Sequence, residues 1–99
     1  MPEFGNPFSG RASDRKLTEA ELVRAIRFMV SAEYEAVQLY MQLAESTENQ
    51  LAKAVLVDIA DEERVHAGEF LRVLHELAPD EAKFYAEGAA EVEKEIEKL

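Results

Sequence analysis

The chain has 99 residues, no cysteine and a formal net charge of -10, which exclude a disulfide framework, a thiolate metal site and the basic patch that nucleic acid requires. No apolar run approaches the roughly 20 residues of a membrane-spanning helix, and residues 1–10 lack the pattern of a signal peptide. We therefore expect a cytoplasmic protein whose acidic surface attracts cations, and which oligomerises because so short a chain buries little surface.

The N-terminal segment predicts no regular structure. Residues 1–16 contain two Pro and two Gly, so we interpret them as a flexible arm ahead of a helical domain spanning residues 17–99. Thr18 and Glu21 form a capping box, which predicts a first helix from about Thr18 to Ser46. Its apolar residues recur every three or four positions, at Leu22, Ile26, Met29, Ala36, Tyr40 and Leu43. Glu33 occupies the missing step in this series.

A second helix follows the polar stretch 46–49. Its apolar residues have the same spacing, at Ala52, Val55, Ile59, Phe70, Val73 and Leu77, and here Glu63 and His66 occupy the missing steps. Pro79 ends this helix near Ala78. A third, shorter helix is expected from about Asp80 to Lys98. The fold class is therefore all-α, an antiparallel two-helix hairpin plus a short third helix.

The three polar residues that interrupt the apolar stripes lie at similar distances from the turn. Glu33 and Glu63 are equally far from Glu48, about 22 Å along their helices from the turn, and His66 is one turn beyond Glu63 on the same face. Two carboxylates and an imidazole in an apolar seam need a compensating charge, and this ligand set suits iron or manganese. One hairpin thus supplies a Glu and a Glu-x-x-His, which is half of a di-iron carboxylate site.

A two-fold dimer would supply the other half and close a four-helix bundle that holds two iron ions. The Glu63 side chains would then bridge the ions, with Glu33 and His66 capping one ion on each side. An alternative is that Glu33 faces solvent and the seam is offset, through Val30, Tyr34, Val37 and Met41. Apolar stripes on two faces of the first helix indicate one face for the hairpin and one for other subunits.

Three further residues are candidates for roles near this half-site or in the structure of the helices. Glu35 points elsewhere on the first helix, as a surface residue or as a guide for incoming cations. Tyr40 lies two turns beyond Glu33, where it lines the site, donates to a ligand or simply packs in the core. His75, near the end of the second helix, is interpreted as structural because its position suits the helix dipole.

Residues 32–40 (AEYEAVQLY) and 61–70 (DEERVHAGEF) resemble the encapsulated ferritins of the ferritin-like superfamily, over residues 22–77. The resemblance implies two-helix chains that dimerise into a ferritin-like four-helix bundle carrying a ferroxidase site, and dimers that assemble into a ring of ten inside an encapsulin shell. The iron ligands correspond to Glu33, Glu63 and His66, and an acid that guides metal inward corresponds to Glu35.

The chain departs from that family at three places. Ala32 stands where a second acid often precedes the first ligand, and only Tyr40 represents a frequent aromatic pair. Residues 93–99 do not resemble the tag by which cargo docks to the shell, although related chains also occur fused ahead of the shell protein.

The leading hypothesis is ferroxidation, in which Fe(II) is oxidised to Fe(III) with oxygen at a di-iron site between two subunits, feeding iron storage in an encapsulin compartment. A rubrerythrin-like peroxidase is a second hypothesis, but without cysteine it lacks the usual electron-delivery iron and needs an external donor. The non-enzymatic alternative is a helical scaffold or passive metal-binding dimer.

Overall fold

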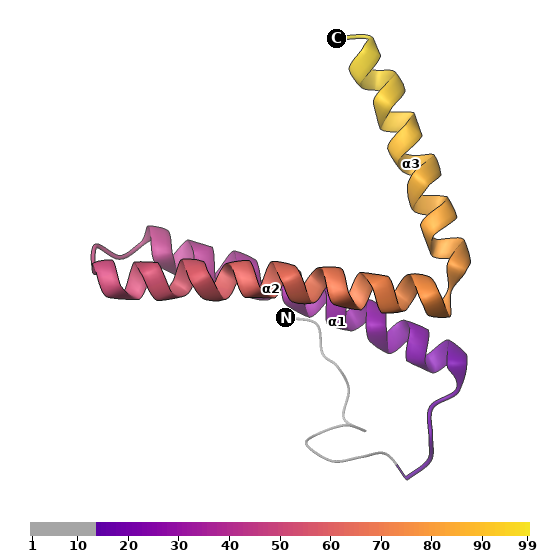
Figure 1. Ribbon diagram of the computed structural model, residues 1–99, viewed down its shortest axis with the longest axis horizontal. Coiled ribbons are helices and arrows are strands. Elements are labelled where there is room, and N and C mark those ends of the chain that lie inside the picture. The colour runs from indigo at the N-terminus through magenta and orange to yellow at the C-terminus, as the bar shows by residue number, and fades with distance from the viewer. Residues whose placement is uncertain (1–13) are drawn as a thin grey trace.

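The computed structural model describes residues 14–99, which form three helices and confirm the all-α prediction (Figure 1). The helices are α1 (Glu19–Glu45), α2 (Gln50–Leu77) and α3 (Pro79–Glu97). Most of the predicted flexible arm, residues 1–13, lies outside the described residues, and residues 14–16 are exposed and non-helical. None of the helices in the described part is both long enough and apolar enough to cross a lipid bilayer.

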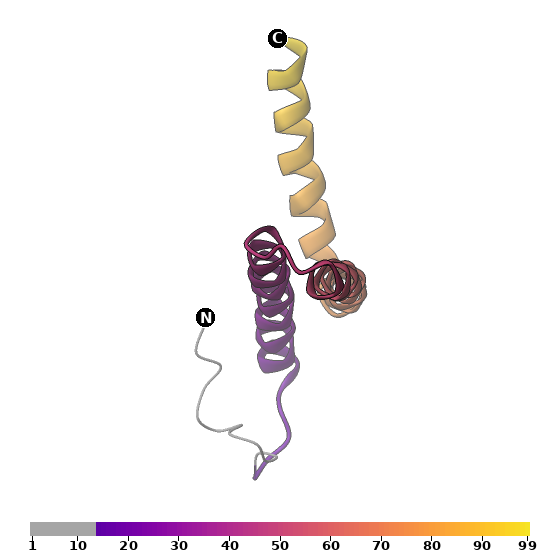
Figure 2. The ribbon, with the colours of Figure 1, turned by 90° about the vertical axis from the view of Figure 1, so that its left-hand side faces the viewer.

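The ends of α1 and α2 follow from local hydrogen bonds. The Thr18 side chain accepts from the Glu21 amide, and the Thr18 amide donates to Glu21 Oε1 at 2.8 Å, so the predicted capping box is confirmed. At the start of α2, Asn49 Oδ1 accepts from the Ala52 amide at 2.9 Å. The two helices run antiparallel and side by side, joined by residues 46–49 (Figures 1 and 2). The predicted turn near residue 48 is therefore confirmed.

The junction of α2 and α3 is a single residue. Ala78 has φ -136° and ψ 76°, outside the helical region, and Pro79 begins α3 at its first position. Proline disfavours helical geometry in the residue before it, which explains why α2 stops there. The break turns the chain sharply, so α3 leaves the hairpin at a steep angle and projects away from both other helices (Figures 1 and 2).

The buried centre of the hairpin is narrow and made mostly of small residues. Its buried side chains lie at seven-residue intervals or multiples of them, at Val30, Ala44, Ala60, Ala67 and Leu74. Small side chains at these positions let the two helices approach closely. The centre is therefore displaced from the predicted seam, because two helices alone can bury only one narrow stripe.

The predicted seam is instead the neighbouring stripe, in which most residues are half-buried. Leu43, Val55 and Val73, all predicted to be buried, are about half exposed. The alternative seam is partly correct, since it passes through buried Val30, but Tyr34 on that line is 55% exposed. Apolar side chains thus lie uncovered on both sides of the hairpin.

The molecule is flat and open. Its radius of gyration is 17.4 Å and its extents are 50 × 46 × 19 Å, whereas a compact domain of this length has a radius of gyration of about 13 Å. None of the side chains of α3 is buried. A chain with so little interior has apolar faces available for partners.

Candidate metal centre

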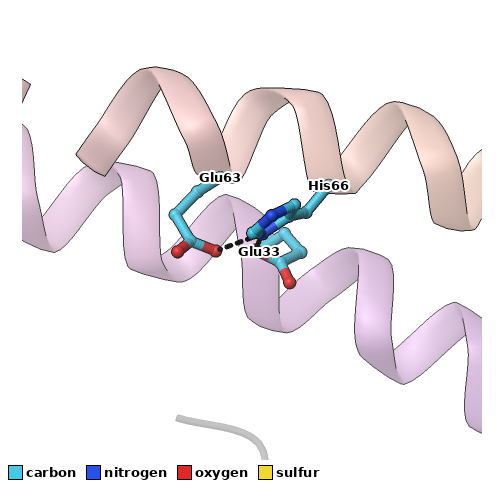
Figure 3. Close-up of side chains that lie close together, drawn as sticks. All are labelled: Glu33, Glu63 and His66. Carbon is cyan, nitrogen blue, oxygen red and sulfur yellow. Dashed lines mark ion pairs between the residues drawn. The ribbon is translucent and has the colours of Figure 1, made fainter. Parts of the chain in front are cut away.

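Three side chains converge near the middle of the hairpin, Glu33 from α1 and Glu63 and His66 from α2 (Figure 3). His66 Nδ1 lies 3.8 Å from Glu33 Oε2 and 3.5 Å from Glu63 Oε2. One potential ligand atom from each residue lies within 4.8 Å of the other two. Within residues 14–99, this is the one group of three or more acidic, histidine or cysteine side chains close enough to share a metal ion.

Helical spacing places these residues on one side of the buried centre. Glu33 is three residues after Val30, and Glu63 is four residues before Ala67, so each carboxylate lies beside the buried stripe of its own helix. His66 follows Glu63 by three residues and shares its face. The antiparallel arrangement then brings the two helical midpoints level. The predicted juxtaposition of the three residues is therefore present in one chain.

The cluster is partly enclosed but open at one edge. The side chains of Glu33 and Glu63 are only 16% and 19% exposed, whereas that of His66 is 47% exposed. The imidazole therefore lies at the rim, where a second chain or a ligand from solvent can approach it. The cluster is therefore more enclosed at the two carboxylates than at the imidazole.

Glu33 Oε2 is buried and has no hydrogen-bond partner. A buried acceptor left without a donor costs about 1–3 kcal/mol. Within the described residues, neither Glu33 nor Glu63 forms an ion pair with lysine or arginine. A cation bound here would supply the missing charge and satisfy that oxygen. Two carboxylates and one imidazole are a donor set that suits iron or manganese.

The other predicted residues lie outside the cluster. Glu35 is turned about 200° from Glu33 around α1 and is not a member of the group. Tyr40 is half-buried and about 10 Å further along the same helical face. Two acids that neighbour Glu63 in sequence also lie outside the cluster: Glu62 is exposed, and Asp61 forms an ion pair with Arg64. The guiding role of Glu35 and the site-lining role of Tyr40 therefore stay predictions.

A polar junction at the base of α3 could not be predicted from spacing. Arg27 of α1 forms an ion pair with Glu81, although the two are 54 residues apart, and the Tyr85 hydroxyl donates to the other Glu81 oxygen. The Arg27 guanidinium, aided by Tyr85, lowers the pKa of Glu81, while the Glu81 carboxylate raises the pKa of Tyr85. His75 packs edge-on against Tyr85, with ring centroids 5.4 Å apart. This contact supports a structural role for His75.

Comparison with known proteins identifies the fold family. Residues 22–99 match the rubrerythrin family. The chain superposes on the encapsulated ferritin domain from Pyrococcus furiosus with a TM-score of 0.84 and 30% identity, covering 93% of this chain and 94% of that one. The superposition includes both helices that carry the cluster, because so little of either chain is left out.

Two curated proteins are similar in sequence. The encapsulin nanocompartment cargo protein EncC from Myxococcus xanthus is 42% identical over 82 residues, which are 83% of this chain and 62% of that protein. A ferritin-like-encapsulin shell fusion protein from Pyrococcus furiosus is 35% identical over 81 residues, which are 82% of this chain and 24% of that protein. The chain thus matches only part of the length of each. Together with the fold match, they place the chain in the rubrerythrin family, among the encapsulated ferritins.

Proposed function

We propose that the chain is a ferroxidase subunit that oxidises Fe(II) to Fe(III) with oxygen at a di-iron site completed by a second copy. The observation that carries the proposal is the group Glu33, Glu63 and His66, in which Glu33 Oε2 is buried and makes no hydrogen bond. This arrangement costs stability in the metal-free chain, and a bound cation removes that cost. Three ligands from one chain leave coordination positions for other ligands.

The second copy is proposed on the apolar surface around the cluster. The face that carries Glu33 and Glu63 also carries Leu43, Val55 and Val73, all about half exposed. Pairing two such faces about a two-fold axis buries this surface and forms a four-helix bundle. Each chain then contributes one Glu and one Glu-x-x-His to a site for two iron ions, with Glu63 near the axis as the bridging ligand.

Iron is the substrate in this proposal, and the electrons and protons of the reaction balance as follows. Two Fe(II) ions each lose one electron, and one oxygen molecule takes up both electrons with two protons, giving two Fe(III) ions and hydrogen peroxide. The side chains hold the two ions close enough to deliver both electrons to one oxygen molecule. Glu33 and Glu63 supply negative charge that favours the ferric product, and the half-exposed His66 leaves a path to solvent.

The compartment is part of the same proposal. Since the similar curated proteins are named as an encapsulin cargo protein and an encapsulin shell fusion, we infer that this domain delivers oxidised iron to an encapsulin shell. Co-expression with such a shell protein tests this inference. Co-purification of the chain inside intact shells, and iron accumulation that requires Glu63, are the expected results.

The central experiment is an anaerobic titration of the metal-free protein with Fe(II), followed by oxygen. Binding of two Fe(II) per dimer and oxidation faster than that of free Fe(II) are expected for the parent, and both should be lost in Glu63→Gln. The matched control is Glu62→Gln, because Glu62 is the exposed neighbour on the same helix. Iron binding unaffected by Glu63→Gln would refute the proposed site, and binding without accelerated oxidation would refute the ferroxidase activity.

A peroxidase is the second candidate, because the chain belongs to the rubrerythrin family. The chain contains no cysteine, so it holds no thiolate-bound iron to deliver electrons, and a peroxidase would need an external donor. The iron-loaded protein is therefore compared with oxygen and with hydrogen peroxide as oxidant. Faster consumption of peroxide in the presence of a donor would favour this candidate over ferroxidation.

A further inference from the structure

The chain contains three methionines and no cysteine, so thioethers are its only sulfur groups. Met1 lies outside the described residues, whereas Met29 and Met41 both belong to α1 and are both half-buried. Peroxide oxidises a thioether to a sulfoxide, which replaces a flexible apolar side chain with a polar one. The two methionines of α1 are therefore similar targets for an oxidant, and they differ in where they lie.

Met29 lies beside the metal cluster. It precedes Glu33 by four residues, which places the two side chains on one face of α1 with Cβ atoms about 5–6 Å apart. It also precedes buried Val30 by one residue, as His66 precedes buried Ala67. Met29 and His66 are therefore on the same side of the buried stripe as Glu33. Counted from the turn, Met29 and His66 are also nearly level across the hairpin.

Met41 lies away from the cluster. It is eight residues beyond Glu33, about 12 Å along α1, and seven residues beyond Tyr34. Tyr34 follows buried Val30 by four residues, whereas Glu33 follows it by three, so Tyr34 and Met41 lie across the buried stripe from Glu33. The same helix thus offers one half-buried thioether at the cluster and a second one as a comparison.

The proposed reaction makes an oxidant at the cluster, and the inference drawn below rests on that proposed function. Each pair of Fe(II) ions that is oxidised leaves one molecule of hydrogen peroxide there. The rim of the cluster is at His66, whose side chain is 47% exposed, and Met29 is level with this rim. Pairing of two metal faces would also enclose Met29, so peroxide would meet this thioether before it reaches Met41.

We propose that Met29 is a modification site, at which peroxide made at the metal cluster is consumed. The O–O bond of the peroxide breaks, and one oxygen atom forms an S=O bond with Met29 Sδ. The other oxygen atom leaves as water with both peroxide protons. The sulfur loses two electrons and the peroxide gains them, so the step needs no further reactant.

Oxidation of Met29 changes the character of the metal face. This face also carries Leu43 and Val55, both about half exposed, and it is the surface proposed to pair with a second copy. Burying a polar group without a hydrogen-bond partner costs free energy, so the sulfoxide weakens this pairing and slows later turnovers. The modification therefore limits the reaction that causes it, and a methionine sulfoxide reductase can reverse it.

The test follows both methionines by peptide mass spectrometry while the parent protein oxidises Fe(II) in oxygen. Catalase is present throughout, because it removes the peroxide that has escaped into solvent. The Met29 peptide should gain one oxygen atom in step with iron oxidation, which is recorded in the same sample, whereas the Met41 peptide should stay unmodified. Glu63→Gln, which removes a ligand of the cluster, should leave both peptides unmodified.

The failure of this inference can be told apart from failure of the proposed function. Iron oxidation that leaves Met29 unmodified, or that modifies Met29 and Met41 equally, would overturn the inference and leave the ferroxidase proposal standing. A protein that does not accelerate iron oxidation would refute both. Since the measurement uses the parent chain, it does not depend on whether a methionine variant folds.

Conservative variants test whether the modification limits turnover. Met29→Leu keeps the size and apolar character of the side chain but cannot form a sulfoxide, and Met41→Leu is the matched control. On repeated additions of Fe(II), the parent and Met41→Leu should lose rate progressively and recover it after treatment with a methionine sulfoxide reductase. Met29→Leu should keep its first rate. Equal loss of rate in Met29→Leu and the parent would contradict the limiting role.

Discussion

Replacing Glu33 with glutamine should stabilise the metal-free protein while removing its response to metal. Glu33 Oε2 is buried without a hydrogen-bond partner, and the side chain is 16% exposed. An unsatisfied buried acceptor costs about 1–3 kcal/mol. Glutamine has the same shape but no charge, and its amide N–H can donate toward Glu63 or His66, whose ligand atoms lie within 4.8 Å. Because the side chain keeps some contact with solvent, we expect the lower end, about 1 kcal/mol, to be recovered. For a domain of this size that is a rise in Tm of about 4–8 °C.

The stabilisation gained on binding metal should be smaller in Glu33→Gln than in the parent. At a free Fe(II) concentration of 100 times Kd, a metal ion that binds only the folded state adds about 2.7 kcal/mol to the stability of the parent. Glu33→Gln removes one of the three ligand side chains, so most of this gain should disappear.

The assay is thermal unfolding by circular dichroism under anaerobic conditions, with and without Fe(II). It uses one fixed protein concentration, because the proposed pairing of two copies would make the Tm depend on concentration. Glu62→Gln serves as the control, since its exposed side chain is outside the cluster, and it should match the parent in both conditions. A lower Tm for metal-free Glu33→Gln, or a gain with Fe(II) equal to that of the parent, would refute the reasoning that this carboxylate is held in place for a cation.

Three further outcomes follow from other parts of the chain. Arg15 and the capping hydrogen bond lower the pKa of Glu21 to about 2. The stabilising contribution of Glu21 is therefore present above its unfolded pKa near 4.5 and is lost as the pH falls toward 2. Acid unfolding monitored by circular dichroism should begin at higher pH in Glu21→Gln than in the parent. The Glu81 carboxylate raises the pKa of Tyr85 above its usual value of 10. The hydrogen bond between the two side chains therefore stabilises the fold below pH 10, and this stabilisation is lost as the pH rises further. In a titration followed at 295 nm, the last tyrosine to ionise should be missing in Tyr85→Phe. Gly88→Ala should stabilise α3 by about 1 kcal/mol, because alanine favours a helix and the added Cβ meets nothing within 4 Å. Slower amide hydrogen exchange confined to α3 would confirm this prediction, and unchanged exchange would contradict it.

Local signals predicted most of the fold. The Thr18 capping box, the polar turn at residues 46–49 and Pro79 each act within a few residues, so they place the ends of the helices within one or two positions. The level positions of Glu33 and Glu63 follow from the turn alone, because both helices are unbroken between the turn and the cluster. The closeness of the three residues was therefore predictable from counting.

Packing was harder to predict. Both helices have apolar residues over more than one face, so periodicity could not decide which stripe forms the narrow centre, and small side chains such as Ala60 and Ala67 carry little hydrophobic signal. The direction of α3 depends on the pair Arg27 and Glu81, which are 54 residues apart. Such contacts arise only once the helices have been placed in space.

The unbroken stretches of helix that run from the turn to Glu33 and from the turn to Glu63 also constrain how this chain can change over time. One residue inserted between Val30 and Glu33 rotates everything after it by about 100° around α1, which would carry the carboxylate across the buried stripe to the position that Tyr34 now occupies, away from Glu63 and His66. Substitutions on the outer faces leave the number of residues between Val30 and Glu33 unchanged. We therefore expect natural variants to differ freely in the identity of exposed residues in this segment but to keep its length, with insertions and deletions confined to the two ends of the chain.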